Sequence, residues 1–159
     1  MIRKSKWWFL AGLIAALDIF SSAAQAQHQA RQCDPQTIVG RWRYYKFVYE
    51  DRVHPPLSPN LVMEYEFYPN GTNRLHWTRT GEHSYCERRG MYIYRDCFLM
   101  DKITWINQKQ NTRECASDPD MKVGRETITE LDFQEGDLVL HLQLGDKPFQ
   151  YIWQRMPEE

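Results

Sequence analysis

Turn signals recur about every ten residues along this chain, and most segments between them alternate apolar and polar side chains. The segment 61–68 reads LVMEYEFY, so leucine, methionine, tyrosine and phenylalanine share one phase and both glutamates share the other. A period of two is typical of a half-buried β-strand. Asn70-Gly71 follows it and suits the positive φ angles of a tight hairpin turn. These features predict an all-β protein.

Eight segments have the composition and length of strands: 40–50, 61–68, 75–79, 84–94, 98–107, 125–133, 138–144 and 149–155. Mostly short turns join them, and the longer connections are the proline-rich loop 51–60 and the polar loop 108–122. Eight antiparallel strands in sequence order favour an up-and-down barrel, because closure removes the free edges of the sheet. A two-sheet sandwich is the alternative. We therefore predict an eight-stranded antiparallel up-and-down barrel without substantial helix.

Residues 1–26 predict a signal peptide. Three basic residues lie among the first six, the apolar run 7–17 is too short to span a bilayer, and small residues precede a cleavage site after Ala26. An uncleaved membrane anchor is the alternative. Cleavage would leave residues 27–159 as a single domain that is secreted or periplasmic and has no membrane span.

Charge and motifs exclude several partners. Three of the 20 basic and one of the 21 acidic residues fall in 1–26, so the mature chain has a formal net charge of −3. This balance does not favour nucleic acid or an anionic membrane as a partner. The chain contains neither a glycine-rich phosphate loop nor a serine in a Gly-x-Ser-x-Gly context. We expect no cofactor.

The mature chain has four cysteines, at positions 33, 86, 97 and 115. In an exported chain an even number of cysteines first indicates disulfides, here two bridges with three possible connectivities. A zinc site is the alternative, although no two cysteines have CxxC spacing.

A Gly40-Arg41-Trp42 sequence opens the first predicted strand, and Arg155 lies on the last. Barrel closure would make these strands neighbours, so that Arg155 could stack on the Trp42 ring and donate to backbone carbonyls. With its eight strands, the chain resembles the lipocalin (calycin) family, and most of all its small exported bacterial members. The resemblance covers essentially the whole mature chain. It implies a barrel open at one end, often holding a small apolar ligand, with Trp42 and Arg155 in structural roles.

In such a barrel, odd strands run toward the open end and even strands run back. Cys33 and Cys97 then fall at the closed end, and Cys86 and Cys115 at the open end. We therefore predict the bridges Cys33–Cys97 and Cys86–Cys115. No residue in this barrel is expected to bind a metal.

Alternation also predicts which side chains point inward. Toward the closed end we expect Trp42, Phe67, Leu75, Met91, Ile93, Leu99, Leu131, Phe133, Leu138, Leu140 and Trp153. The predicted ligand-binding residues lie nearer the open end: Met63, Trp77, Arg79, Tyr85, Trp105, Arg125, Phe149 and Tyr151. Leu142, Glu87 and Arg89 share the inward phase, and a bulge in the fourth strand would reverse the last two.

The predicted function is non-catalytic binding of a small apolar or amphipathic ligand, one with an acidic group if the arginines face it. A barrel filled by its own side chains is equally compatible with eight strands. The rival function is a protein-binding module, such as an inhibitor of an exported enzyme, that acts through the loops 51–60 and 108–122. A barrel isomerase or lyase would depend on Glu87. The CASDPDM segment 115–121 is expected to cap turns and not to bind calcium.

Overall fold

The computed structural model describes residues 33–34, 38–83, 85–111 and 113–157. The predicted signal peptide, residues 1–26, lies outside these ranges. The elements are β1 (Gly40–Tyr49), β2 (Arg52–His54), β3 (Leu61–Phe67), β4 (Thr72–Arg79), β5 (Tyr85–Arg95), β6 (Phe98–Ile106), α2 (Arg113–Ser117), the 3₁₀ helix η1 (Pro119–Met121), β7 (Glu126–Gln134), β8 (Asp137–Leu144) and β9 (Lys147–Arg155). None of the helices among the described residues has the length and apolar character needed to cross a bilayer.

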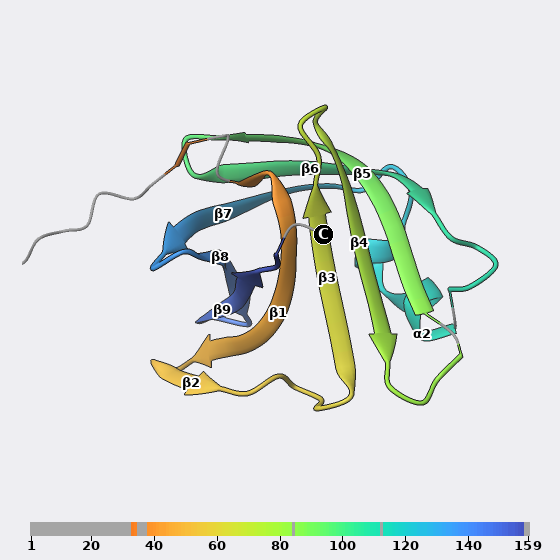
Figure 1. Cartoon of the computed structure of the whole chain (residues 1–159), viewed down its shortest axis with the longest axis horizontal. Helices are drawn as coiled ribbons and strands as arrows, with labels where there is room; N and C mark the ends of the chain where they lie inside the picture. Colours follow the sequence, from red (N-terminus) through yellow and green to blue (C-terminus); the bar gives the residue numbers. More distant parts are fainter. Residues whose placement is uncertain (1–32, 35–37, 84, 112, 158–159) are drawn as a thin grey trace, which may run out of the picture.

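The strands form a closed antiparallel barrel (Figure 1). Neighbours follow the order β1-β3-β4-β5-β6-β7-β8-β9, and β9 pairs with β1 to complete the ring. This confirms the eight-stranded barrel and rules out the sandwich. The short strand β2 is an addition, since it folds back on the end of β1 within the predicted loop 51–60. The predicted loop 108–122 also has local structure, namely α2 and η1.

A packed aromatic and aliphatic core fills the closed end. Trp42 is fully buried, its indole N–H donates to the Ile38 carbonyl at 2.9 Å, and the Arg155 guanidinium lies 4.2 Å from its ring centroid. Arg155 in turn donates to the Val39 carbonyl at 2.9 Å. Gly40 has a φ of +134°, and a Cβ there would lie 2.5 Å from the Arg155 guanidinium. The Gly-x-Trp sequence therefore provides both the ring and the room for its cation.

Both predicted disulfides are present, which also leaves no thiolate for the alternative zinc site. The Cα atoms are 4.9 Å apart in Cys33–Cys97 and 5.8 Å apart in Cys86–Cys115. The second bridge forms a small cluster with Met121, against which Trp77 packs. It therefore holds the segment that contains α2 and η1 at the open end.

The predicted inward phase of β5 was wrong. Met91 and Ile93 point outward and are 58% and 59% exposed. The opposite phase faces the interior, because Cys86 forms the bridge to the loop and the buried Tyr94 hydroxyl donates to the Leu131 carbonyl at 3.0 Å. Arg88 shares this phase and is buried.

A bulge on β6 explains a second error. Arg89 is in register with Trp105 but Gly90 with Ile103, so Thr104 has no partner and the alternation shifts by one residue. Trp105 therefore points outward and is 42% exposed.

Candidate functional site

Burial of the inward side chains varies within each end of the barrel. Phe67, Leu131 and Leu138 at the closed end are buried, whereas Leu75 and Phe133 in that half are only partly buried. Met63 and Tyr151, which occupy the same inward phase nearer the open end, are only partly buried. The same holds for further inward residues of that half, namely Phe47, Trp77, Thr127 and Leu142. We call the open-end half of the interior the mouth chamber and define it by Phe47, Met63, Trp77, Leu142, Phe149 and Tyr151. Phe149 is buried, and the other five side chains are partly exposed.

One side of the mouth chamber is an aromatic wall built by β1 and β9, which are neighbours only because the barrel closes. Tyr151 makes edge contacts with Tyr44 at 4.9 Å and with Phe149 at 4.8 Å between ring centroids. Phe47 lies 5.4 Å from Phe149. Burial, followed by the charge of Tyr151, raises the pKa of Tyr44 to about 12. Tyr44 therefore stays uncharged well into the alkaline range.

The interior also contains a buried polar cluster of Tyr65, Asn73, Arg88 and Asp101. One Asp101 oxygen accepts from Arg88 at 2.7 Å and from the Tyr65 hydroxyl at 3.0 Å. The other accepts from the Asn73 amide at 2.8 Å. Burial disfavours the Arg88 charge, but Tyr65 and Asp101 outweigh it and raise the pKa of the guanidinium. Arginine and aspartate thus neutralise each other inside the barrel.

Gly90 makes room for this cluster. A Cβ at position 90 would lie 2.7 Å from an Asp101 carboxylate oxygen and from the Lys102 carbonyl, and 2.9 Å from the Asn73 side-chain oxygen. Real Cβ atoms do not approach so closely, so a side chain here would displace the Asp101 and Asn73 groups. Absence of a side chain at Gly90 is a condition for the cluster.

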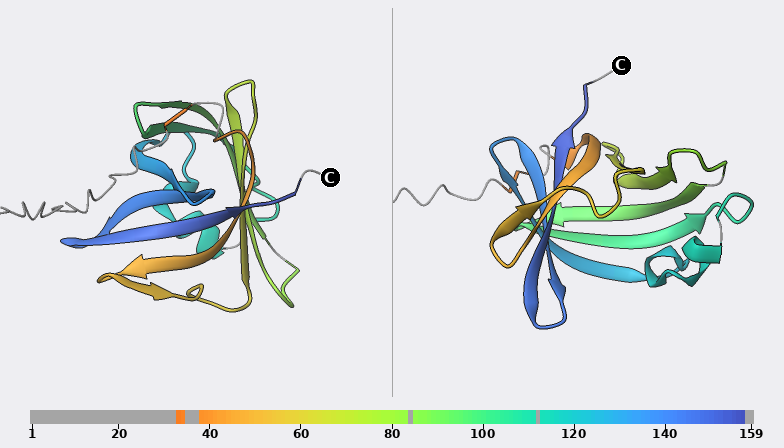
Figure 2. Two further views of the ribbon diagram at one scale, coloured as in Figure 1. Left: turned by 60° about the vertical axis from the view of Figure 1, so that its left-hand side comes forward. Right: turned by 90° about the horizontal axis from the view of Figure 1, so that it is seen from below.

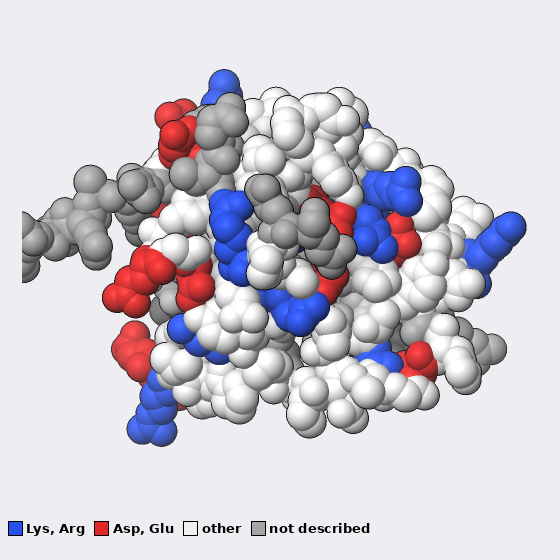
Figure 3. Space-filling view, in the orientation of Figure 1, with Lys and Arg blue, Asp and Glu red and all other residues white. Residues whose placement is uncertain are grey.

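The outer face of β1, β3, β4 and β5 carries an ion-pair lattice, seen as interleaved basic and acidic side chains in Figure 3. Glu87 belongs to it and accepts from Arg74 at 3.1 Å and from Arg89 at 3.2 Å. Burial disfavours its charge, but both arginines outweigh that effect and lower the pKa of the carboxyl. Glu87 and Arg89 therefore lie outside the barrel, contrary to the predicted phase, and Glu87 does not face the interior as the isomerase or lyase alternative requires.

The structure brings together four of the eight predicted ligand-binding residues. Met63, Phe149 and Tyr151 line the mouth chamber from β3 and β9. Trp77 lines it from β4 and packs on the cluster of the Cys86–Cys115 bridge.

Arg79 continues the inward phase of Trp77 and is exposed at the end of β4. The other three lie elsewhere. Tyr85 is on the outer phase, with its ring 5.0 Å from His76. Trp105 lies beneath the Arg89 guanidinium at 4.9 Å on the outer face. Arg125 forms a 2.8 Å ion pair with Asp120 in the loop.

The CASDPDM acids have structural roles. Asp118 caps η1 by accepting from the Asp120 amide at 2.8 Å, and Asp120 pairs with Arg125. Within the described part of the chain, no three His, Cys, Asp or Glu side chains are grouped closely enough to hold a metal ion.

Sequence reasoning missed the polar cluster, although a signal for it exists. Asn73 and Asp101 occupy the inward phases set by Leu75 and Leu99 on their own strands. A carboxylate on an inward phase requires a buried cation. Arg88 meets that requirement in the structure, although the predicted phase of β5 would have supplied Arg89 instead.

Comparison with protein-family models and with curated proteins finds no match. Among solved structures, the chain is similar to a lipocalin-like protein from Bacteroides uniformis, with 13% identity over 76% of this chain and 99% of that chain and a TM-score of 0.52. An uncharacterized protein from Bacteroides eggerthii is 16% identical, with 75% and 99% coverage and a TM-score of 0.48. At such identities the likeness concerns the fold alone. Together with the closed eight-stranded ring, it shows that this chain has a lipocalin-like fold.

Proposed function

We propose that this protein is an exported, non-catalytic binding protein that takes a small apolar or amphipathic molecule into the mouth chamber. The observation that carries the proposal is the partial exposure of side chains that point into the barrel, Met63 and Tyr151 among them. Two disulfides indicate a protein outside the cytoplasm and support the exported part of the proposal.

The aromatic wall favours a ligand with a flat apolar ring. Rings pack edge-on or offset against such a surface, and each good aromatic contact adds roughly 0.5–1.5 kcal/mol beyond area burial. An acidic group has less support, because Asp101 already neutralises Arg88 and Arg125 is paired with Asp120 in the loop. The proposed selection is therefore by shape and aromatic contact.

A fluorescence titration tests this with two dyes, the neutral N-phenyl-1-naphthylamine and the anionic 1-anilinonaphthalene-8-sulfonate. We expect saturable 1:1 binding of the neutral dye and no advantage for the sulfonate. Tyr151→Ala should weaken binding about tenfold through loss of one ring contact, whereas Tyr151→Phe retains it.

Trp105→Ala is the matched control, because it removes a ring of the outer face. Equal effects of the Tyr151 and Trp105 substitutions would contradict the proposal, as would the lack of saturable binding by either dye. Tighter binding of the sulfonate dye than of the neutral dye would instead favour a ligand with an acidic group.

A further inference from the structure

The barrel wall is split between β7 and β8 at the open end. β7 pairs with β6 over Glu126–Glu130, but its pairing with β8 starts only at Glu130. β8 pairs with β7 as far as His141, and residues 142–144 pair with β9 alone. Figure 2 shows the β8–β9 hairpin diverging from β7 in the view from below. Two strand edges thus face a gap that no described strand fills, and we call this gap the seam.

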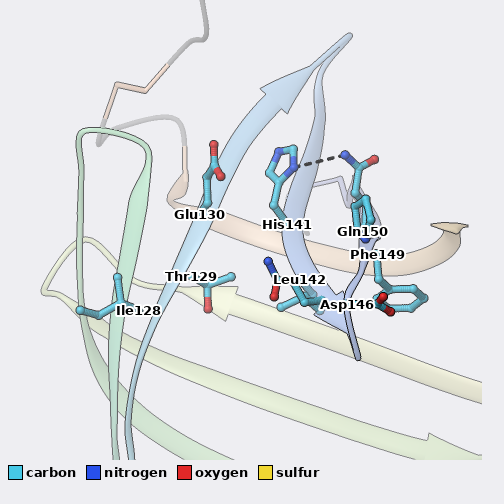
Figure 4. A pocket seen from close by; sticks show the side chains of 10 residues that line it. Ile128, Thr129, Glu130, His141, Leu142, Asp146, Phe149 and Gln150 are labelled. Carbon is cyan, nitrogen blue, oxygen red and sulfur yellow. Dashed lines mark hydrogen bonds between the residues drawn. The ribbon is translucent and has the colours of Figure 1, made fainter. Parts of the chain in front are cut away.

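The seam contains a cleft of about 520 Å³ (Figure 4). Its lining residues come from both edges and from the β8–β9 turn: Ile128, Thr129, Glu130, His141, Leu142, Gln143, Asp146, Pro148, Phe149 and Gln150. It is therefore separate from the polar cluster and meets the mouth chamber only at Leu142 and Phe149.

The backbone of both edges is oriented for strand pairing. In an antiparallel ladder, alternate residues direct their N–H and C=O groups to opposite neighbours. The Leu131 amide donates to the Cys97 carbonyl and the Ile103 amide donates to the Arg125 carbonyl, so the odd residues of β7 face β6. The amide and carbonyl of Ile128 consequently face the seam. On β8, His141 is paired with Glu130 and directs its amide and carbonyl toward β7. By the same alternation, the amide and carbonyl of Gln143 also face the seam.

Apolar side chains surround this edge. Ile128 is 73% exposed on the outer surface. Ile128 is paired with Met100 of β6, which is paired with the exposed Ile93 of β5, so the three side chains form a row across the outer face of the sheet. Adjacent exposed apolar side chains on one sheet face are typical of a contact surface.

The charge of the cleft favours a basic partner segment over a second copy of this chain. Its ten lining residues include the acids Glu130 and Asp146 but neither lysine nor arginine. Antiparallel pairing of two copies about Ile128 would place Glu126 opposite Glu130 of the other copy, and like charges directly opposite are destabilising. A basic segment would instead complement the two acids of the cleft, Glu130 and Asp146, while its lysine stems could cover Ile128. Glu126 already forms a 2.8 Å ion pair with Lys102.

We propose that the seam binds an extended segment of a partner polypeptide that alternates basic and apolar residues and adds as a strand to the edge of β7. Basic side chains point outward to the acids, and apolar ones point inward to Leu142 and Phe149. Main-chain hydrogen bonds supply affinity and the alternating side chains supply specificity. The inference does not depend on a ligand in the mouth chamber.

The test uses an acetylated and amidated Lys-Val-Lys-Val-Lys peptide, titrated into isotopically labelled protein and followed by NMR. We expect saturable shifts of the Ile128 and Gln143 amides. The same peptide with its three lysine backbone amides N-methylated keeps its charge but loses the hydrogen bonds that antiparallel pairing makes to the edge of β7, and should bind at least about tenfold more weakly. Equal affinities of the two peptides would reduce the effect to charge attraction and overturn the proposal.

Ile128→Pro removes the seam-facing N–H without touching the β6 ladder, a place where a strand tolerates proline. It should abolish binding, whereas Ile128→Val should retain it. If the proline variant does not fold, the methylated peptide on the unaltered protein decides the matter alone. A dimer of the unliganded protein that Ile128→Pro dissociates would show that a second copy occupies the seam, and would also overturn the proposal.

Discussion

The buried Arg88–Asp101 pair is the residue-scale feature on which the interior depends. Both side chains are nearly inaccessible, and the carboxylate accepts from three donors. A buried pair is a weak source of net stability, but removing one partner leaves the other charged and uncompensated. Its effect on folding should therefore be visible mainly when it is broken.

Asp101→Asn should lower the free energy of unfolding by about 3–5 kcal/mol, because Arg88 stays charged in a buried site. Urea denaturation measures the change. Adding Arg88→Met should recover most of the loss, since the unpaired charge is then gone. Glu126→Gln, which breaks the exposed pair with Lys102, should cause no measurable loss. A double variant no more stable than Asp101→Asn would contradict this account.

The raised pKa of Tyr94 predicts that the protein loses stability in alkali. Burial, with a smaller contribution from Asp132, raises its pKa from 10.0 to about 12. The folded state therefore holds the phenol proton more tightly than the unfolded chain. This contribution is complete below pH 10 and is lost as the pH rises through about 12. From about pH 8 to 11, the unfolding temperature should fall less steeply for Tyr94→Phe than for the unaltered protein. Parallel curves for the two proteins would contradict this role of Tyr94.

At the scale of elements, each disulfide joins a segment outside the ring to the ring itself, at the β5–β6 turn for Cys97 and on β5 for Cys86. Cys33–Cys97 attaches the N-terminal arm at the closed end, and Cys86–Cys115 attaches the α2–η1 segment at the open end. The sequence separations are 64 and 29 residues. In the chain-entropy model, the longer loop should contribute more stability by roughly 0.7 kcal/mol.

Replacing Cys86 and Cys115 with alanine should lower stability by about 2–4 kcal/mol and make residues 108–122 the first site of limited proteolysis. The corresponding Cys33/Cys97 variant should lose slightly more stability without exposing that loop. Cleavage of the loop at equal rates in both variants would show that Met121 packing, and not the bridge, holds it in place.

Across the whole molecule, packing and strand pairing decline from the closed end to the seam. Trp42 and Tyr65 lie in the buried core and in fully paired strands, whereas Ile128 and Gln143 border the seam. Local opening costs least where buried contacts and ladder bonds are few.

Native-state hydrogen exchange should therefore be slowest at the amides of Trp42 and Tyr65 and, among barrel strands, fastest at Ile128 and Gln143. The bound Lys-Val peptide should slow exchange at the last two alone. Uniform protection around the ring would mean that the seam is closed in solution.

Local chemistry in the sequence was enough to predict the strands and their order. Alternation with period two marks each strand, the Asn70-Gly71 pair places a hairpin, and closure follows from avoiding free edges. The same order then allowed both cysteine pairs to be assigned.

Tertiary structure decided which phase of β5 faces inward, because both phases carry apolar residues: Met91 and Ile93 on one, Tyr92 and Tyr94 on the other. It also decided where Trp105 points, since the Thr104 bulge depends on pairing with a distant strand. The polar cluster and the seam have the same origin. The cluster joins side chains of four consecutive strands, and the seam lies where β8 stops pairing with β7, so both depend on contacts between strands. Local alternation marks Asn73 and Asp101 as inward but does not identify their partners.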